Sequence, residues 1–119
     1  MSDEAVLDVG VDGFLRQLNE QGFAPINRDG FAVFLYTIPL GSHIGETVEV
    51  GLQVPPDFPI TPPPGPHVNP LLHHPGGAVH GSPLGSQWCY WSRPFNGWPA
   101  STRMVREYMA HVRNLFSQL

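Results

Sequence analysis

Apolar side chains recur at helical spacing near both ends of the chain and at strand-like spacing between them. The first helical stripe predicts a short amphipathic helix over residues 11–20. It consists of Val11, Phe14, Leu15 and Leu18. A second stripe with a period of about 3.6 residues predicts a helix over residues 100–119, with Ser101 or Thr102 as its cap. It consists of Met104, Val105, Tyr108, Met109, Val112, Leu115 and Phe116.

The segments between the two helices are rich in β-branched and aromatic residues. Phe31 to Leu40 reads as a buried strand, and Thr47 to Val54 alternates polar and apolar residues like a strand with one wet face. Phe23 to Asn27 and His67 to Asn69 are candidates for two shorter strands. Turn-forming residues separate these segments, so the pattern predicts an antiparallel meander of about four strands.

Proline then interrupts the pattern. Pro55 to Pro66 cannot join a central ladder because proline lacks the donor N–H, so we expect an extended crossing with Phe58 packed inward. Residues 70–97 combine Gly, Pro, His and aromatic side chains without a period and predict a long ordered loop, which is usually functional in a compact domain. The expected fold is α+β, in a single domain spanning residues 1–119.

Composition narrows the function classes. Hydrophobic residues make up 41% of the chain, which is enough to fold one core. The net charge of −4 and the absence of a basic stripe argue against nucleic acid as a partner. No apolar run is long enough to span a membrane, and residues 1–12 are too polar for a signal peptide. With one cysteine and no secretion signal, we expect a cytoplasmic protein.

Cys89 is the residue with the most direct chemical potential. A lone thiol cannot form an intramolecular disulfide, so it is a buried filler, a metal ligand or a nucleophile. It follows the polar, glycine-rich run Gly81 to Ser86 rather than lying in an apolar periodic segment, which favours an accessible nucleophile. His74 and His80 precede it and Arg93 follows it, and any of the three can lie near it in space.

Several motifs occur in a familiar order around this cysteine. They are the crossing Phe58-Pro59-Ile60-Thr61-Pro62-Pro63, the tripeptide His74-Pro75-Gly76, Cys89 between two tryptophans, and Trp98-Pro99 before the last helix. Their order resembles that of ubiquitin-conjugating enzymes, and the details resemble prokaryotic family E of that UBC-fold superfamily. The resemblance covers the chain from about Val11 onward. It implies a UBC-like fold with an N-terminal helix, a four-stranded antiparallel meander, an ordered active-site loop and a C-terminal helix.

The chain departs from the family pattern at three points. Gly76 replaces the Asn whose amide, in the family, supports the loop and the tetrahedral oxyanion. Cys89 lies thirteen positions after Gly76, a longer separation than usual, and one long helix follows where eukaryotic relatives have further helices. We take His80 as the first candidate for the missing oxyanion donor or for proton transfer. His74, the tripeptide equivalent, is the second candidate and is otherwise expected to support the loop.

The resemblance implies a specific activity. A bacterial conjugating enzyme accepts a ubiquitin-like modifier from an activating, adenylating enzyme as a thioester on its cysteine, here Cys89. It then transfers the modifier to a target amine or hydroxyl. No metal or organic cofactor is needed at this step. The family context also implies an antiphage defence pathway, with a deconjugating protease as a further possible partner.

Two alternatives stay open at this point. The first is a non-catalytic variant of the same fold that binds a ubiquitin-like protein without carrying it, which the missing Asn keeps in play. The second is a zinc-binding domain that uses the cluster His67, His74 and His80, with His73 and Cys89 as further ligand types. The spacing fits no recognised zinc pattern, and adjacent histidines rarely bind one metal, so polar packing in the loop is the commoner role for such residues.

Overall fold

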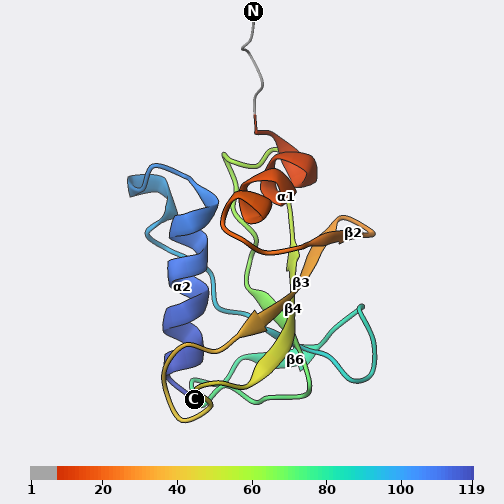
Figure 1. The fold of residues 1–119 in the computed structure, drawn as a ribbon, viewed down its shortest axis with the longest axis vertical. Helices are drawn as coiled ribbons and strands as arrows, with labels where there is room; N and C mark the ends of the chain where they lie inside the picture. The colour runs from red at the N-terminus through yellow and green to blue at the C-terminus, as the bar shows by residue number, and fades with distance from the viewer. Residues whose placement is uncertain (1–7) are drawn as a thin grey trace, which may run out of the picture.

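The computed structural model describes residues 8–119, so the first seven residues of the expected 1–119 domain lie outside the described part. It has an α+β fold in which six antiparallel strands form one sheet, with two α-helices packed against it (Figure 1). In chain order the elements are α1 (Gly10–Glu20), β2 (Ile26–Arg28), β3 (Phe31–Thr37), β4 (Thr47–Gln53), β5 (Pro66–Asn69), β6 (Val79–Gly81), β7 (Cys89–Trp91), a 3₁₀ turn (Trp98–Ala100) and α2 (Val105–Ser117).

The prediction of four strands was wrong, because the described part of the chain has six. The first four strands do lie side by side in chain order, and β7 then pairs with β5 while β6 pairs with the outer side of β7. Both added strands fall in residues 70–97, which we expected to be irregular. Each is only three residues long, too short to show an alternating pattern in the sequence.

The sheet has two faces with different coverings. Directly paired residues of antiparallel strands point to the same face, so the register assigns each side chain to a face. The helix face carries the main core. It includes Ala32, Phe34, Tyr36, Val48, Val50, Leu52, Val68, Cys89 and Trp91. The far face carries Phe31, Val33, Leu35, His67, Tyr90 and His80.

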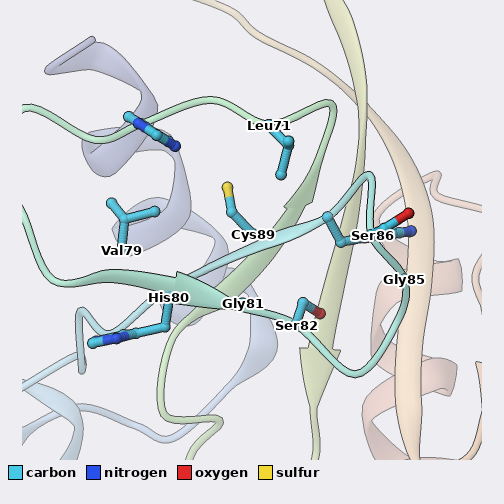
Figure 2. A pocket seen from close by; sticks show the side chains of 10 residues that line it. Leu71, Val79, His80, Gly81, Ser82, Gly85, Ser86 and Cys89 are labelled. Carbon is cyan, nitrogen blue, oxygen red and sulfur yellow. The ribbon is translucent and has the colours of Figure 1, made fainter.

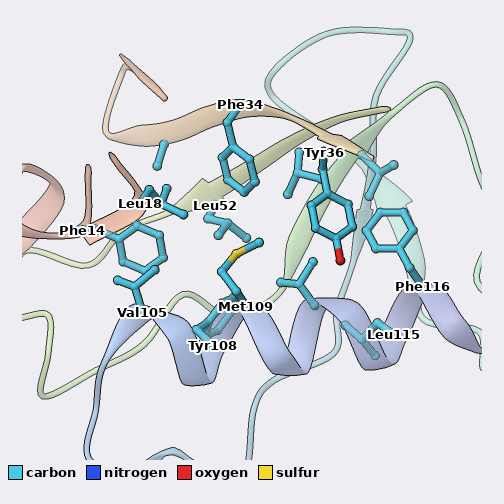
Figure 3. Packing of buried hydrophobic residues seen from close by; sticks show 14 of the residues in the cluster. Phe14, Leu18, Phe34, Tyr36, Leu52, Val105, Tyr108, Met109, Leu115 and Phe116 are labelled. Carbon is cyan, nitrogen blue, oxygen red and sulfur yellow. The ribbon is translucent and has the colours of Figure 1, made fainter. Parts of the chain in front are cut away.

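Helix α2 lies along the helix face of the sheet. Figure 3 shows side chains of α2, among them Met109 and Phe116, pointing toward Phe34, Tyr36 and Leu52 of the strands. The rings of Tyr36 and Phe116 are 5.2 Å apart between centroids. This layer buries the apolar stripe of the C-terminal segment, as its helical period predicts.

Helix α1 and the proline crossing close one end of the same core. Phe58 is fully buried, which confirms that the crossing turns this ring inward. Its ring lies 5.0 Å from that of Phe14 on α1 and 5.8 Å from that of Trp98. Tyr108 of α2 completes this aromatic group. The crossing is therefore held between both helices rather than along the sheet.

The last helix is shorter than the predicted 100–119. It begins at Val105, and Trp98–Ala100 form a separate 3₁₀ turn. Arg103, between the two, has a φ of 58°, which lies in the left-handed region and cannot continue a right-handed helix. The Trp98-Pro99 step therefore begins the 3₁₀ turn and not α2.

Neither Ser101 nor Thr102 is the N-cap of α2, contrary to expectation. Met104 occupies that position, and its own side chain cannot accept the hydrogen bonds that Ser or Asp would. The carboxylate of Glu107 replaces it, accepting the backbone N–H groups of Thr102 at 3.0 Å and Met104 at 3.1 Å, together with the Thr102 hydroxyl. One acidic side chain thus accepts three donors just before the helix.

A loop between β6 and β7 covers part of the far face. Its Leu84 and Trp88 pack on Phe31 and Val33 to form a second, smaller core. Gly51 makes this possible, because a Cβ at that position would stand 2.5 Å from Cδ1 of Leu84. This loop connects β6 to β7, and Cys89 is the first residue of β7.

Candidate functional site

Cys89 is the first residue of β7 and points to the helix face of the sheet. The residue is 3% exposed. Its Sγ donates to the carbonyl oxygen of Leu72 at 3.1 Å, and Nε1 of Trp91 donates to the same oxygen at 2.7 Å. The Leu72 carbonyl therefore ties the loop after β5 to two side chains of β7, those of Cys89 and Trp91.

The thiol also lines a pocket of about 440 Å³. Figure 2 shows the sulfur between Leu71 and Val79, with Gly81 on the neighbouring strand β6. Gly81 is the direct partner of Cys89 in the β6–β7 ladder, and a Cβ added there would meet nothing within 4 Å. The other lining residues are His73, His80, Ser82, Gly85, Ser86 and Trp88. A small part of the Cys89 side chain is thus exposed to the pocket, next to Gly81, which has no side chain to block it.

Burial sets the acidity of this thiol. Because little water reaches the sulfur, burial raises the pKa of Cys89 above the ordinary value for a cysteine. The neutral thiol is therefore the resting form near pH 7, and a base must take up its proton to generate the thiolate nucleophile.

We expect alkylation of Cys89 by iodoacetamide to rise at higher pH in the folded protein than in the same protein unfolded in urea. The folded pKa is raised, so the stabilisation from the buried neutral thiol is present below the ordinary pKa of ~8.5 and is lost as pH rises through the folded value. Mass spectrometry at a series of pH values follows the single cysteine without background from others. Coincident folded and unfolded profiles would contradict the raised pKa.

His74 belongs to the loop after β5, and its side chain is buried. Its Nε2 donates to the carbonyl oxygen of Leu115 near the end of α2 at 3.1 Å, and its Nδ1 accepts the backbone N–H of Gly76 at 3.0 Å. Burial lowers the pKa of His74, which agrees with a neutral ring that donates at one nitrogen and accepts at the other. These contacts tie the loop to α2 and use both ring nitrogens.

His80 lies on β6 beside Cys89 but faces the other way. It pairs with Tyr90, not with Cys89, so its side chain belongs to the far face, where its ring lies 6.0 Å from that of Tyr90. Figure 2 shows the His80 ring and the Cys89 sulfur pointing in opposite directions. Both residues line the pocket because β6 is an edge strand. The imidazole reaches the thiol side only around that edge.

His73 is a pocket residue that the sequence analysis considered only as a possible zinc ligand. It is exposed and lines the same pocket as Cys89, whereas its neighbour His74 is buried. The sequence does contain a signal for this position, the adjacent pair His73-His74, because neighbouring residues in an extended segment point to opposite sides. With His74 directed toward α2, His73 is left on the pocket side.

The structure does not bring together the three histidines of the zinc alternative. His67 is buried on the far face, where its Nδ1 is hydrogen-bonded to Ser82 Oγ at 2.7 Å and the ring of Tyr90 stacks on it. His74 points to α2 and His80 lies on an exposed edge strand. Within residues 8–119, no three His, Cys, Asp or Glu side chains are grouped to hold a metal ion. Among the described residues the alternative fails because His74 points to α2, while Tyr90 stands between His67 and His80 on the far face.

The comparisons with protein-family models, curated proteins and solved structures found no match to this chain. No helix among the described residues is long and apolar enough to cross a membrane.

Proposed function

We propose that this protein is a UBC-like conjugating enzyme that carries a ubiquitin-like modifier as a thioester on Cys89. The observation that carries the proposal is the position of the chain's single thiol, which lines an open pocket beside the side-chain-free position 81. The resemblance of the proline crossing and the Trp98-Pro99 step to family E adds the fold and the activity class. The proposed setting is cytoplasmic, in an antiphage defence pathway.

The chemistry has two steps. Sγ of Cys89 loses its proton and attacks the activated carbonyl carbon at the modifier's C-terminus, an S–C bond forms, and the leaving group of the activating enzyme departs and takes up a proton. An amine or hydroxyl of the target then attacks the thioester carbonyl, and the sulfur leaves as a thiolate that takes up a proton. A donor near the carbonyl oxygen stabilises the tetrahedral state in both steps.

The geometry favours His73 over His80 as this donor. Both line the pocket, but the His80 side chain points to the opposite face of the sheet from the thiol. His74 has both ring nitrogens engaged by the loop and α2, which suits loop support rather than chemistry.

We expect His73→Ala to slow discharge of a preformed thioester by ~100- to 1000-fold, the effect of losing one preorganised oxyanion donor. We expect His80→Ala to discharge faster than His73→Ala, and His74→Ala to lower the melting temperature. The measurement is single-turnover discharge to a small amine, together with thermal unfolding of each variant. If His80→Ala shows the larger loss, the first candidate from the sequence is the donor and His73 is not.

A second candidate function is a non-catalytic module that binds a ubiquitin-like protein. Two observations favour it: the thiol is nearly buried, and burial raises its pKa, so it rests in the unreactive form. In this case the modifier docks without a covalent bond.

One experiment separates the two candidates. The protein is incubated with an activating enzyme, a ubiquitin-like modifier and ATP, and its intact mass is measured before and after DTT. A DTT-labile adduct on the wild type supports conjugation. Binding of the modifier by titration calorimetry without any adduct supports the binding module and rejects the thioester.

A further inference from the structure

Position 76 and the side chain of Arg93 compete for one space. A Cβ built on Gly76 would stand 2.0 Å from Nη2 of Arg93 and 2.6 Å from its Cζ. The guanidinium therefore lies directly over the Gly76 backbone, where any side chain at that position would begin. Glycine at 76 and arginine at 93 are thus a matched pair.

Arg93 is firmly attached to the strands and to α2. Its backbone N–H donates to the carbonyl oxygen of Trp91 at 2.8 Å, and its own carbonyl oxygen accepts Nε2 of His111 at 2.8 Å. With the backbone fixed at both ends, the side chain reaches across to the turn, and Nη2 donates to the carbonyl oxygen of Gly77 at 3.2 Å. The Arg93 Nε is buried and has no partner among residues 8–119.

An unpaired buried N–H carries a cost in folding free energy, so its retention calls for an explanation. The turn beneath the guanidinium provides one. Gly77 N–H donates to the His74 carbonyl and Gly76 N–H donates to His74 Nδ1, which makes residues 74–77 a compact unit. Leu72, two residues before this unit, supplies the carbonyl oxygen that accepts the Cys89 thiol.

We propose that Arg93 is a positioning residue that replaces a side chain at position 76 and clamps the 74–77 turn, so that the Leu72 carbonyl stays fixed over Cys89. The effect on transfer rests on the proposed function. The effect on access to the thiol does not, because it depends only on how tightly this loop is held.

Three variants test the pairing. Arg93→Ala removes the clamp. Gly76→Asn pushes the guanidinium aside, since the two shortest contacts of its Cβ are with the far end of this flexible side chain and the third, with His74 Nδ1, is 3.0 Å. The double variant Gly76→Asn/Arg93→Ala puts an amide donor into the vacated space. Arg106→Ala is the matched control, because it removes the same charge from an exposed position on α2.

Two readouts are measured for each variant, with melting temperature alongside. We expect each single substitution to raise the iodoacetamide alkylation rate of Cys89 by up to about tenfold, the factor for one lost hydrogen bond. We expect thioester discharge to fall by about 100-fold, as misplacement by 1 Å does elsewhere. The double variant should return toward wild type in both, and the control should match wild type.

Recovery of wild-type alkylation and discharge rates in the double variant separates a positioning role of Arg93 from a simple loss of stability. Losses that merely add in the double variant would overturn the proposal, as would an Arg93→Ala protein whose thiol reacts at the wild-type rate. If no variant, wild type included, ever forms a thioester, the proposed function fails. The alkylation rates still decide whether Arg93 holds the loop over Cys89.

Discussion

Replacing Cys89 by serine is expected to abolish the DTT-labile adduct completely. The chain has a single cysteine, so no other side chain can form a thioester. The fold should survive, because serine is slightly smaller and its hydroxyl can donate to the Leu72 carbonyl that now accepts the thiol. A Cys89→Ser protein that traps the modifier as a DTT-resistant oxyester, seen as an intact-mass shift, would place the acyl group at this position.

Cys89→Ala is the companion variant. It removes the nucleophile and leaves no hydroxyl, so neither adduct should form, while non-covalent binding of the modifier should continue. A DTT-labile adduct on Cys89→Ala would reject Cys89 as the acyl carrier. Equal modifier affinity in wild type and Cys89→Ala, with no adduct in either, would favour the binding module.

The secondary structure was most predictable where a pattern is long. The helical stripe at residues 11–20 and the strands near 31–40 and 47–54 each contain enough positions to show a period, and the structure places them within a few residues. β6 and β7 have three residues each, and their pairing depends on the loop that folds Leu84 and Trp88 onto the far face. That packing is a long-range contact which no local pattern encodes.

Polar contacts between distant elements were equally hidden. Gln17 lies on α1 and is buried, and its Oε1 accepts the backbone N–H of Val105 at the start of α2 at 2.8 Å. In the sequence this glutamine is one polar residue beside an apolar stripe. The link to a residue 88 positions away appears only when both helices are in place. It also helps to explain why α2 begins at Val105 rather than at Ala100.

The site was predictable in composition but not in orientation. The sequence singled out Cys89 and the nearby histidines, yet the faces of β6 and β7 follow from their register, which the sequence did not reveal. One residue of register decides whether His80 points toward the thiol or away from it. The same limit hid the place of His73 in the pocket, which follows from the opposite orientation of His74.

Among the substitutions proposed here, Trp98→Ala is expected to lower the stability of the fold most. The residue is 1% exposed, and its Nε1 donates to the Pro59 carbonyl oxygen at 2.8 Å. Its ring lies 5.8 Å from Phe58 and 6.4 Å from Tyr108 between centroids, so it packs the proline crossing against α2. These partners of its ring and Nε1 belong to the proline crossing and to α2.

Trp98→Ala should lower the free energy of unfolding by ~3–5 kcal/mol, the cost of truncating a large buried aromatic. That is a large part of the ~5–15 kcal/mol typical of a domain, and it corresponds to a fall in melting temperature of roughly 10 °C or more. Urea titration followed by circular dichroism measures the loss. Trp98→Phe should lose less, because it keeps an aromatic ring and removes the Nε1 hydrogen bond. If Trp98→Ala unfolds like wild type and loses only transfer activity, the tryptophan acts in a binding or catalytic site instead of holding the crossing to α2.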